Sequence, residues 1–293
     1  MVKDQVVLGL SGGVDSLVAA LVLKEEYQER LHCIFIDTGL MRKNELEEIK
    51  KLSNDNNLDL IVFDAKEEFL NSLKGIVDPE EKRKIIGAEF IKAFKKVAKG
   101  IPNAKYLAQG TILSDIKESQ KGDSFVKSHH NVGGLPQELG FELLEPLKHL
   151  TKDQVRAKGI ALGIDKEFIN RQPFPGPGLA VRILGEVTYD KIIIAKESDY
   201  LLQRFLVDND IKPFQSFTVV LDSKSTGIKD GKRNYSYVIA IRIVDSIDTK
   251  TAQVNYFDIK LTELANKIVN EVPNVSRVVY DITSKPPGTI EWE

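Results

Sequence analysis

Residues 1–110 carry a repeating order in which a short apolar run is followed by a stretch with helical spacing. The apolar run at 5–10, for example, precedes a one-face helical pattern that begins at Val14. The expected strands are 5–10, 31–40, 59–65 and 105–110, and the expected helices are 14–22, 44–52, 66–76 and 79–100. Repeated strand–helix units predict a doubly wound, mainly parallel α/β sheet covered by helices on both faces.

The pattern changes after residue 110. Residues 111–141 show little periodicity, which in a compact domain is typical of a lid or another functional loop. The run at 171–182, RQPFPGPGLAVR, is rich in proline and glycine and predicts a rigid connection. We therefore expect a first domain over 1–175 and a smaller α+β domain over 176–293. The later elements are expected as helices at 145–164, 189–207 and 251–269 and strands at 216–223, 235–244 and 276–283.

Composition narrows the class of protein. The chain has 293 residues, 42% of them hydrophobic, with 43 acidic against 41 basic side chains. This balance fits a globular protein with two cores and gives no electrostatic reason to expect nucleic acid or a membrane surface as the partner. The single cysteine, Cys33, lies in an apolar run and predicts a buried thiol. With no long apolar run and no signal-peptide pattern at the start, the cytoplasm is the expected compartment.

The stretch SGGVDS, at 11–16, separates the first expected strand from the first expected helix. Its glycines let successive backbone N–H groups converge on one point, and the helix N-terminus adds positive potential, so the turn can hold phosphate. Asp15 would repel a bare phosphate, which suggests an accompanying Mg²⁺. The alternative is a tight strand-to-helix turn with a serine or aspartate cap. The stretch is not a Walker A loop, because no Gly-Lys-Ser/Thr follows.

This stretch resembles the pyrophosphate-binding loop of the ATP pyrophosphatases, which transfer AMP from ATP and release pyrophosphate. Further segments narrow the resemblance to the GMP synthase family, specifically to its ATP pyrophosphatase part. They are FIDTGLMRKNE, EEKRKIIGAEF, LAQGTI, KSHHNVGGLP, RQPFPGPGLAVRILGEVT and SRVVYDITSKPPGTIEWE. The resemblance covers essentially the whole chain. The glutaminase domain that precedes this part in the fused enzymes is expected to be missing, since the first strand begins close to Met1.

The resemblance implies a reaction. The C2 oxygen of xanthosine monophosphate (XMP) is adenylated by ATP, and ammonia then displaces AMP to give GMP. It implies that the ATP phosphates lie on Ser11, Gly12, Gly13, Val14, Asp15, Ser16 and Leu17. Asp15 is the expected Mg²⁺ ligand. Asp37 ends the second expected strand, where doubly wound sheets bind ligands, although a turn or helix-capping aspartate is an open alternative.

Within 111–141 the resemblance assigns Asp115 and Glu118 to the transfer step. The segment departs from the family at Ser114, where proline is common, and at Lys117, where an aliphatic residue is common. His129 and His130 lack a surrounding ligand set, so a structural zinc site is not expected there. They are either ordinary polar loop residues or contacts to substrate in a closed lid.

The resemblance implies XMP contacts at Arg83, Gln215, Asp230, Lys285 and Glu291. Without it, these would be solvated surface, strand-edge, turn or disordered-tail residues.

The tail KPPGTIEWE is stiffened by two prolines and contains Trp292, the chain's single tryptophan. Its lysine can meet phosphate, and Glu291 can accept from ribose hydroxyls or base N–H groups. Arg171 and Arg182 flank the proline-rich connection, and which of them meets a phosphate stays open.

The sequence thus predicts a C–N ligase that uses ATP and Mg²⁺. The expected ammonia source is a separate glutaminase, and a homodimer is expected through the second domain. One rival is another ATP pyrophosphatase, such as an NAD, asparagine or argininosuccinate synthetase, which would not be expected to share the tail. A rival from another class is a regulatory subunit that binds nucleotide without turnover. The joint presence of Asp15, Asp115, Glu118 and Lys285 argues against that rival.

Overall fold

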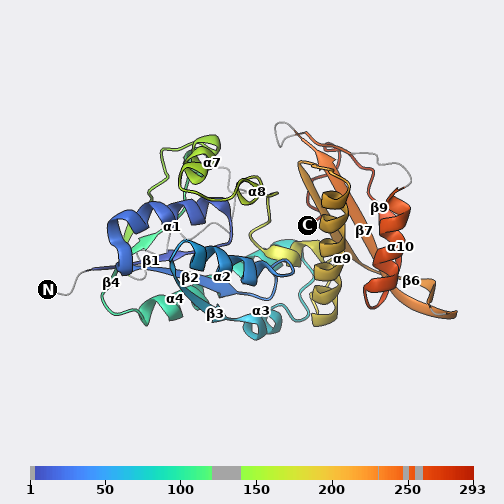
Figure 1. The fold of residues 1–293 in the computed structure, drawn as a ribbon. Coiled ribbons are helices and arrows are strands. Elements are labelled where there is room, and N and C mark those ends of the chain that lie inside the picture. The colour runs from blue at the N-terminus through green and yellow to red at the C-terminus, as the bar shows by residue number, and fades with distance from the viewer. Residues whose placement is uncertain (1–3, 121–139, 230, 247–250, 255–259) are drawn as a thin grey trace. The chain divides into compact units, whose positions relative to one another are not determined.

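The structure is a computed structural model that describes residues 4–120, 140–229, 231–246, 251–254 and 260–293 (Figure 1). It divides into two compact units. The first unit comprises 1–38, 44–69 and 83–171, and the second comprises 39–43, 70–82 and 172–293. One division falls inside a single helix, between Lys82 and Arg83. Our expected boundary at residue 175 remains a prediction about the functional domains.

The first unit is built on a five-stranded parallel sheet with the order β3-β2-β1-β4-β5. Its strands are β1 (Gln5–Gly9), β2 (Leu31–Asp37), β3 (Asp59–Asp64), β4 (Ala104–Ala108) and β5 (Glu142–Leu144). The chain passes from β1 through β2 to β3 on one side and then returns to β4 on the other side of β1. The sheet order therefore reverses at β1, and ligands of doubly wound sheets bind at such a reversal, beyond the carboxyl ends of the strands.

Helices connect these strands, as the apolar spacing predicts. They are α1 (Val14–Tyr27), α2 (Glu45–Asp55), α3 (Lys66–Ser72), α4 (Pro79–Lys99), α5 (Leu113–Gln120), α7 (Lys152–Ala161) and α8 (Lys166–Ile169), with a 3₁₀ turn η1 (Gln28–Arg30). Helices α1 and α7 pack together. In Figure 1, α1 and α4 lie on opposite sides of the sheet. No helix in the described part of the chain is long and apolar enough to cross a membrane.

The second unit has a four-stranded sheet in which β6 pairs with β7, and β7 also pairs with β8 and β9. Its elements are η3 (Gly178–Arg182), α9 (Tyr189–Asp208), β6 (Gln215–Lys229), β7 (Lys232–Asp245), β8 (Gln253–Val254), α10 (Lys260–Glu271) and β9 (Val275–Tyr280). The β7–β9 pair is parallel and the others are antiparallel. Phe217 and Val244 belong to its core, which also includes Ile290 from the chain's last residues. The expected fold class is confirmed.

Three sequence-based boundaries were wrong. The helix expected at 145–164 begins at Lys152, because Thr151 and Gln154 form a capping box that starts it there. The helix expected at 251–269 is replaced at its start by β8, and α10 begins at Lys260. The irregular stretch expected at 111–141 opens with helix α5, and most of the remainder lies outside the described residues.

The buried thiol of Cys33 gives the first test. Its side chain is fully buried in β2, and burial raises its pKa to about 12 because the thiolate would be poorly solvated there. We expect iodoacetamide at pH 8 to leave Cys33 unmodified in the folded chain and to modify it once in denaturant, as measured by intact mass. Rapid single alkylation of the folded chain would contradict the buried position.

Candidate functional site

The turn between β1 and α1 is held by its own two hydroxyl groups. The Ser16 Oγ donates to the Gly13 carbonyl at 2.9 Å and lies 3.1 Å from the Ser11 Oγ. Backbone N–H groups of Ser11 and Gly13 donate in turn to Ser16 Oγ and Ser11 Oγ at 3.2 and 3.3 Å. These contacts fix the backbone of the turn in a defined shape. They give the serines a structural role that local chemistry alone did not specify.

Helix α1 begins at this turn without a side-chain cap. Gly13 is the N-cap residue, and it has no side chain that could accept a hydrogen bond from the first-turn N–H groups. The first internal helical bond runs from Leu17 N–H to the Gly13 carbonyl at 3.2 Å. The N–H groups of the first turn are thus left for water or for an anion. This observation favours the phosphate interpretation over the capped-turn alternative.

Two glycines allow the close contacts around the turn. Gly12 has φ +81°, and a Cβ there would lie 2.8 Å from Ile49 Cδ1. A Cβ on Gly110, which follows β4, would lie 2.9 Å from the carbonyl carbon of Asp15. Any larger residue at Gly110 must displace the first turn of α1. The glycine of the LAQGTI segment therefore lets this segment pack closely against the first turn of α1.

Asp15 is held by a lysine that the sequence analysis missed. Lys152 Nζ lies 2.8 and 2.7 Å from the two carboxylate oxygens of Asp15, with both side chains partly exposed. Lys152 is the first residue of α7, where the helix dipole disfavours a cation, so the acidic partner compensates for its position. No local pattern in the sequence links Lys152 to Asp15, which lies 137 residues away. The turn thus has a cationic group from elsewhere in the chain, although its own motif lacks one.

Arg171 fixes the opposite side of the turn. Its Nη1 donates to the Gly12 carbonyl at 3.1 Å, and its Nη2 lies 2.8 Å from the carboxylate of buried Glu45. The guanidinium group of Arg171 is thus engaged with a backbone carbonyl and a carboxylate of the first unit. These contacts give Arg171 a structural role at the turn, and which of Arg171 and Arg182 meets a phosphate stays open.

The donor set at the turn fits Mg²⁺ with a phosphate ligand. Mg²⁺ in nucleotide sites is commonly held by one or two carboxylates together with phosphate oxygens and water. Asp15 supplies one carboxylate beside the uncapped N-terminus of α1. Among the described residues, no group of three or more His, Cys, Asp or Glu side chains could hold a metal by itself. A magnesium ion here would therefore depend on the phosphates it accompanies.

Asp37 ends β2 and is 6% exposed. Its Oδ2 lies 3.0 Å from Lys66 Nζ, and this contact is the main reason that the pKa of Lys66 is raised. The carboxylate of Asp37 is therefore engaged with a neighbouring helix of the same unit. Its expected ATP contact remains a prediction.

The candidate residues of the lid are only partly described. Asp115 lies in the first turn of α5, where its carboxylate accepts from the Ile112 N–H at 3.1 Å and so helps to cap the helix. Glu118 lies in the same helix, but its side chain is outside the described residues. His129 and His130 also lie outside the described residues.

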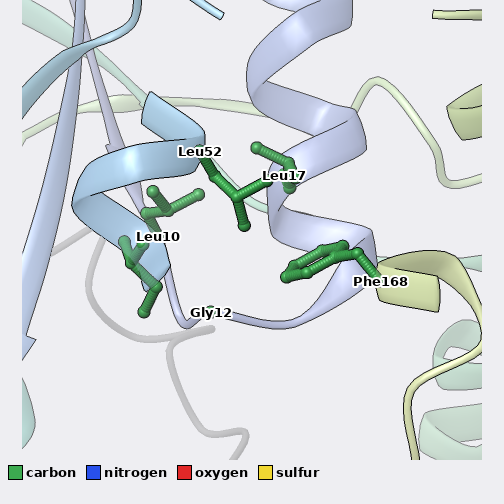
Figure 2. A pocket seen from close by; sticks show the side chains of 6 residues that line it. Leu10, Gly12, Leu17, Leu52 and Phe168 are labelled. Atoms are coloured by element: carbon green, nitrogen blue, oxygen red, sulfur yellow. The ribbon is translucent and has the colours of Figure 1, made fainter. Parts of the chain in front are cut away.

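A small apolar pocket lies beside the turn. Figure 2 shows Leu10, Leu17, Leu52 and Phe168 around Gly12, and Ile49 completes the lining. No polar side chain lines it, so it cannot supply hydrogen bonds to a phosphate. Its walls include side chains from α1, α2 and α8, namely Leu17, Leu52 and Phe168.

The second unit brings together two of the expected XMP residues. Glu291 Oε1 accepts from Gln215 Nε2 at 2.7 Å. The same carboxylate accepts two bonds from Arg182, with Nε at 3.1 Å and Nη2 at 2.9 Å. Gln215 and Arg182 are buried, whereas the Glu291 side chain is 22% exposed. The arrangement presents one carboxylate in a fixed orientation at the surface of this unit.

The tail that carries Glu291 is ordered, which contradicts the disordered alternative. Lys285 forms an isolated β-bridge with Ala252, and Trp292 donates from its indole N–H to Asp281 at 2.8 Å. Arg83 lies in α4 of the first unit. Asp230 lies outside the described residues. The expected XMP contacts of Lys285, Arg83 and Asp230 stay predictions.

The support from Gly110 gives the second test. We expect Gly110→Ala to weaken binding of magnesium pyrophosphate about 100-fold, because the new methyl group displaces the backbone of the α1 N-terminus. Gly9→Ala is the matched control, since its Cβ would meet Phe94 at an ordinary 3.5 Å. Titration calorimetry measures both. Equal binding by the two variants would remove Gly110 from the support of the turn.

Comparison with known families assigns the two ends of the chain separately. A family model described as NAD synthase matches residues 2–96. A second model, described as GMP synthase C terminal domain, matches residues 204–292. A solved structure, NMN synthetase from Francisella tularensis, is 17% identical, covers 60% of this chain and 69% of its own, and has a TM-score of 0.45. The fold described above does not depend on that likeness.

Curated relatives match along the whole chain. One named GMP synthase (glutamine-hydrolyzing), from Malacoplasma penetrans strain HF-2, is 52% identical and covers 100% of this chain. Relatives of the same name from Borreliella burgdorferi strain N40 and from Caldanaerobacter subterraneus subsp. tengcongensis are each 50% identical over 99% of it. The chain spans 59% of the first relative's length and 58% of the other two. The chain is thus similar to NAD synthase over residues 2–96, to the GMP synthase C terminal domain over residues 204–292, and to relatives named GMP synthase along its whole length.

Proposed function

We propose that this chain is the ATP pyrophosphatase part of a GMP synthase, which adenylates XMP at its C2 oxygen and then aminates it. The observation that carries the proposal is the uncapped N-terminus of α1 with Asp15 and Lys152 beside it. That arrangement suits the two phosphates of a pyrophosphate leaving group together with a divalent cation. The match of residues 204–292 to the GMP synthase C terminal domain supports XMP as the acceptor. The NAD synthase match ends at residue 96 and therefore does not extend to this segment.

The reaction forms one bond and breaks one bond in each half. In the first half, the C2 oxygen of XMP attacks the α-phosphorus of ATP, and the bond from that phosphorus to the bridging oxygen breaks to release pyrophosphate. In the second half, ammonia adds to C2 and AMP leaves with the original C2 oxygen. Ammonia loses one proton as its nitrogen becomes the 2-amino group of GMP, and a ring N–H of XMP loses another when the C2 oxygen is adenylated; both protons pass to solvent or buffer.

The first unit would act mainly on the leaving group. First-turn N–H groups of α1 donate to the pyrophosphate oxygens as negative charge accumulates there, which stabilises the transition state. Lys152 adds a mobile cation that can transfer from Asp15 to phosphate. A bound Mg²⁺, held by Asp15 and the phosphates, would supply further neutralisation of that charge. Asp115 and Glu118 are proposed to act in the transfer step, as the family resemblance implies.

The second unit would bind the acceptor. Glu291 presents a carboxylate that can accept from ribose hydroxyls or from base N–H groups, and Gln215 lies against it. Lys285 is proposed to meet the phosphate or the developing charge, with Arg83 and Asp230 as further XMP contacts. These assignments rest on the family resemblance and on the ordered tail that carries Glu291.

Ammonia is proposed to come from a separate glutaminase. The relatives are named glutamine-hydrolyzing, which supports glutamine as the origin of that ammonia. A homodimer through the second unit is proposed as well. Without glutaminase or free ammonium, the chain should form the adenylated acceptor and stop there.

An assay of both halves tests the function. We expect release of AMP and pyrophosphate from MgATP to require XMP, and at high ammonium to match GMP formation one for one. Release with another acceptor but not XMP would keep the phosphate site and overturn the choice of acceptor. No release with any acceptor, even with a glutaminase partner present, would favour the regulatory-subunit alternative.

The role of Asp15 is tested by Asp15→Asn, which preserves the shape of the side chain. We expect a folded protein whose pyrophosphate release is lost, because removing charge stabilisation at the phosphates costs several kcal/mol of transition-state stabilisation. Asp153→Asn, at an exposed carboxylate on α7, is the control and should retain activity. Near-normal release by the Asp15 variant would remove Asp15 from the mechanism.

A further inference from the structure

Three cationic side chains are among the largest fully buried side chains of the described residues. They are Arg182, Arg242 and Lys82, with exposures of 1%, 0% and 0%. All three belong to the second unit, and each holds part of the chain's final segment, residues 281–293, which we name the tail. Such complete burial of a cation is costly unless it is paired and hydrogen-bonded. The fact that all three buried cations bind the tail therefore needs a physical explanation.

Arg242 holds the backbone of the tail. It donates to the carbonyls of Thr283, Thr289 and Ile290 at 2.6, 2.9 and 3.1 Å. It also lies 2.8 Å from the Asp281 carboxylate, which accepts the indole N–H of Trp292. These bonds fold the tail back on itself and seat Ile290 in the core. They account for its order, but they do not fix the two glutamate side chains.

Arg182 fixes the first glutamate. Its Nε and Nη2 make a two-bond contact with the Glu291 carboxylate, which is the geometry that gives the strongest orientation of a carboxylate by arginine. The guanidinium itself lies 5.2 Å from the ring centre of Phe174 and 4.2 Å from that of Phe217. Its Nη1 has no hydrogen-bond partner among the described residues. A buried N–H donor without an acceptor lowers the stability of the folded chain. Stability alone therefore does not explain why an arginine stands at this position.

Lys82 fixes the second glutamate. Its Nζ lies 2.5 Å from Glu293 Oε2 and donates to the Ile183 carbonyl at 2.7 Å. The Glu293 side chain is 7% exposed, so the pair is almost completely removed from water. Burial lowers the pKa of Lys82, while the contact with Glu293 opposes that shift. The last residue of the chain is thus tied to the first turn of α4.

We propose that Arg182 and Lys82 are positioning residues for the acceptor nucleotide, which hold the tail carboxylates so that Glu291 meets its ligand in a fixed orientation. This inference rests on the proposed function. Buried ion pairs often stabilise a fold no more than apolar side chains of similar volume would, whereas in some proteins they specify geometry. Apolar packing through Ile290 and Trp292 already secures the tail to the core. Orientation of the carboxylates is the property that the two cations add.

The chain offers a matched control at Lys191. This lysine is 3% exposed, lies 2.6 Å from an Asp222 oxygen, and donates to the carbonyls of Leu184 and Glu186. It resembles Lys82 in burial, in its unit and in its kind of partners. None of these contacts is with the tail. Lys191→Met therefore reproduces the loss of a buried, paired ammonium without touching the tail carboxylates.

The test measures KM for XMP and for ATP in Arg182→Met, Lys82→Met and Lys191→Met at high ammonium. We expect KM for XMP to rise roughly 10- to 100-fold in the first two variants, in keeping with loss of charged hydrogen bonds, and KM for ATP to stay within about twofold. Lys191→Met should leave both constants near the wild-type values. Equal rises for XMP and ATP, or the same rise in the control, would show a structural role and overturn the proposal.

A double-mutant cycle separates positioning from general support. If Arg182 acts through Glu291, Arg182→Met should add little to the KM effect of Glu291→Gln in the double variant. Fully additive effects would contradict a path through Glu291. Should Lys82→Met not fold, Glu293→Gln removes the same ion pair from its other end.

Hydrogen exchange of the tail gives a readout that does not depend on turnover. The N–H groups of 288–293 should exchange at the wild-type rate in Arg182→Met, Lys82→Met and Lys191→Met, because Arg242 and the packing of Ile290 hold the tail backbone. Faster exchange in the Arg182 or Lys82 variant would show general support of the tail and overturn the positioning role. A wild-type chain that uses an acceptor other than XMP would overturn the proposed function alone. The KM comparison, repeated with that acceptor, would then decide the positioning role.

Discussion

The turn between β1 and α1 is the constraint on which the first unit depends. It must leave the N–H groups of a helix N-terminus without a side-chain cap, and so its shape has to be held from outside. Gly12 and Gly110 allow close approach on two sides, and Arg171 binds the Gly12 carbonyl. Two serine hydroxyls hold the turn from within. An uncapped helix end leaves backbone N–H groups without an acceptor in the protein, and those groups can bind an anion.

Charge at this turn is balanced before any ligand binds. Asp15 and Lys152 pair with each other through both carboxylate oxygens, and the proposed function gives each a different partner in the nucleotide complex. The carboxylate suits a divalent cation, and the ammonium suits a phosphate. The second unit uses another approach, in which buried cations orient one partly buried carboxylate and one buried carboxylate.

Local sequence patterns predicted most elements of the fold, because the periodicity of strands and helices can be recognised within a short run of neighbouring residues. Helix α9 was expected at 189–207 and is found at Tyr189–Asp208. The SGGVDS turn could also be located, since its glycines and its place after a strand are local features. Contacts such as Lys82 with Glu293, which are 211 residues apart, could not be predicted because no local pattern links them. For the same reason Lys152 was missed, and the Arg182 partner remained open.

The most direct test of adenylation follows the C2 oxygen of XMP. XMP labelled with ¹⁸O at C2 is converted by this chain in the presence of MgATP and ammonium, and the products are analysed by mass spectrometry. The account predicts one ¹⁸O atom in the phosphate of AMP and none in pyrophosphate or water. Label that appears in water or in pyrophosphate, with unlabelled AMP, would contradict activation of the C2 oxygen by AMP transfer.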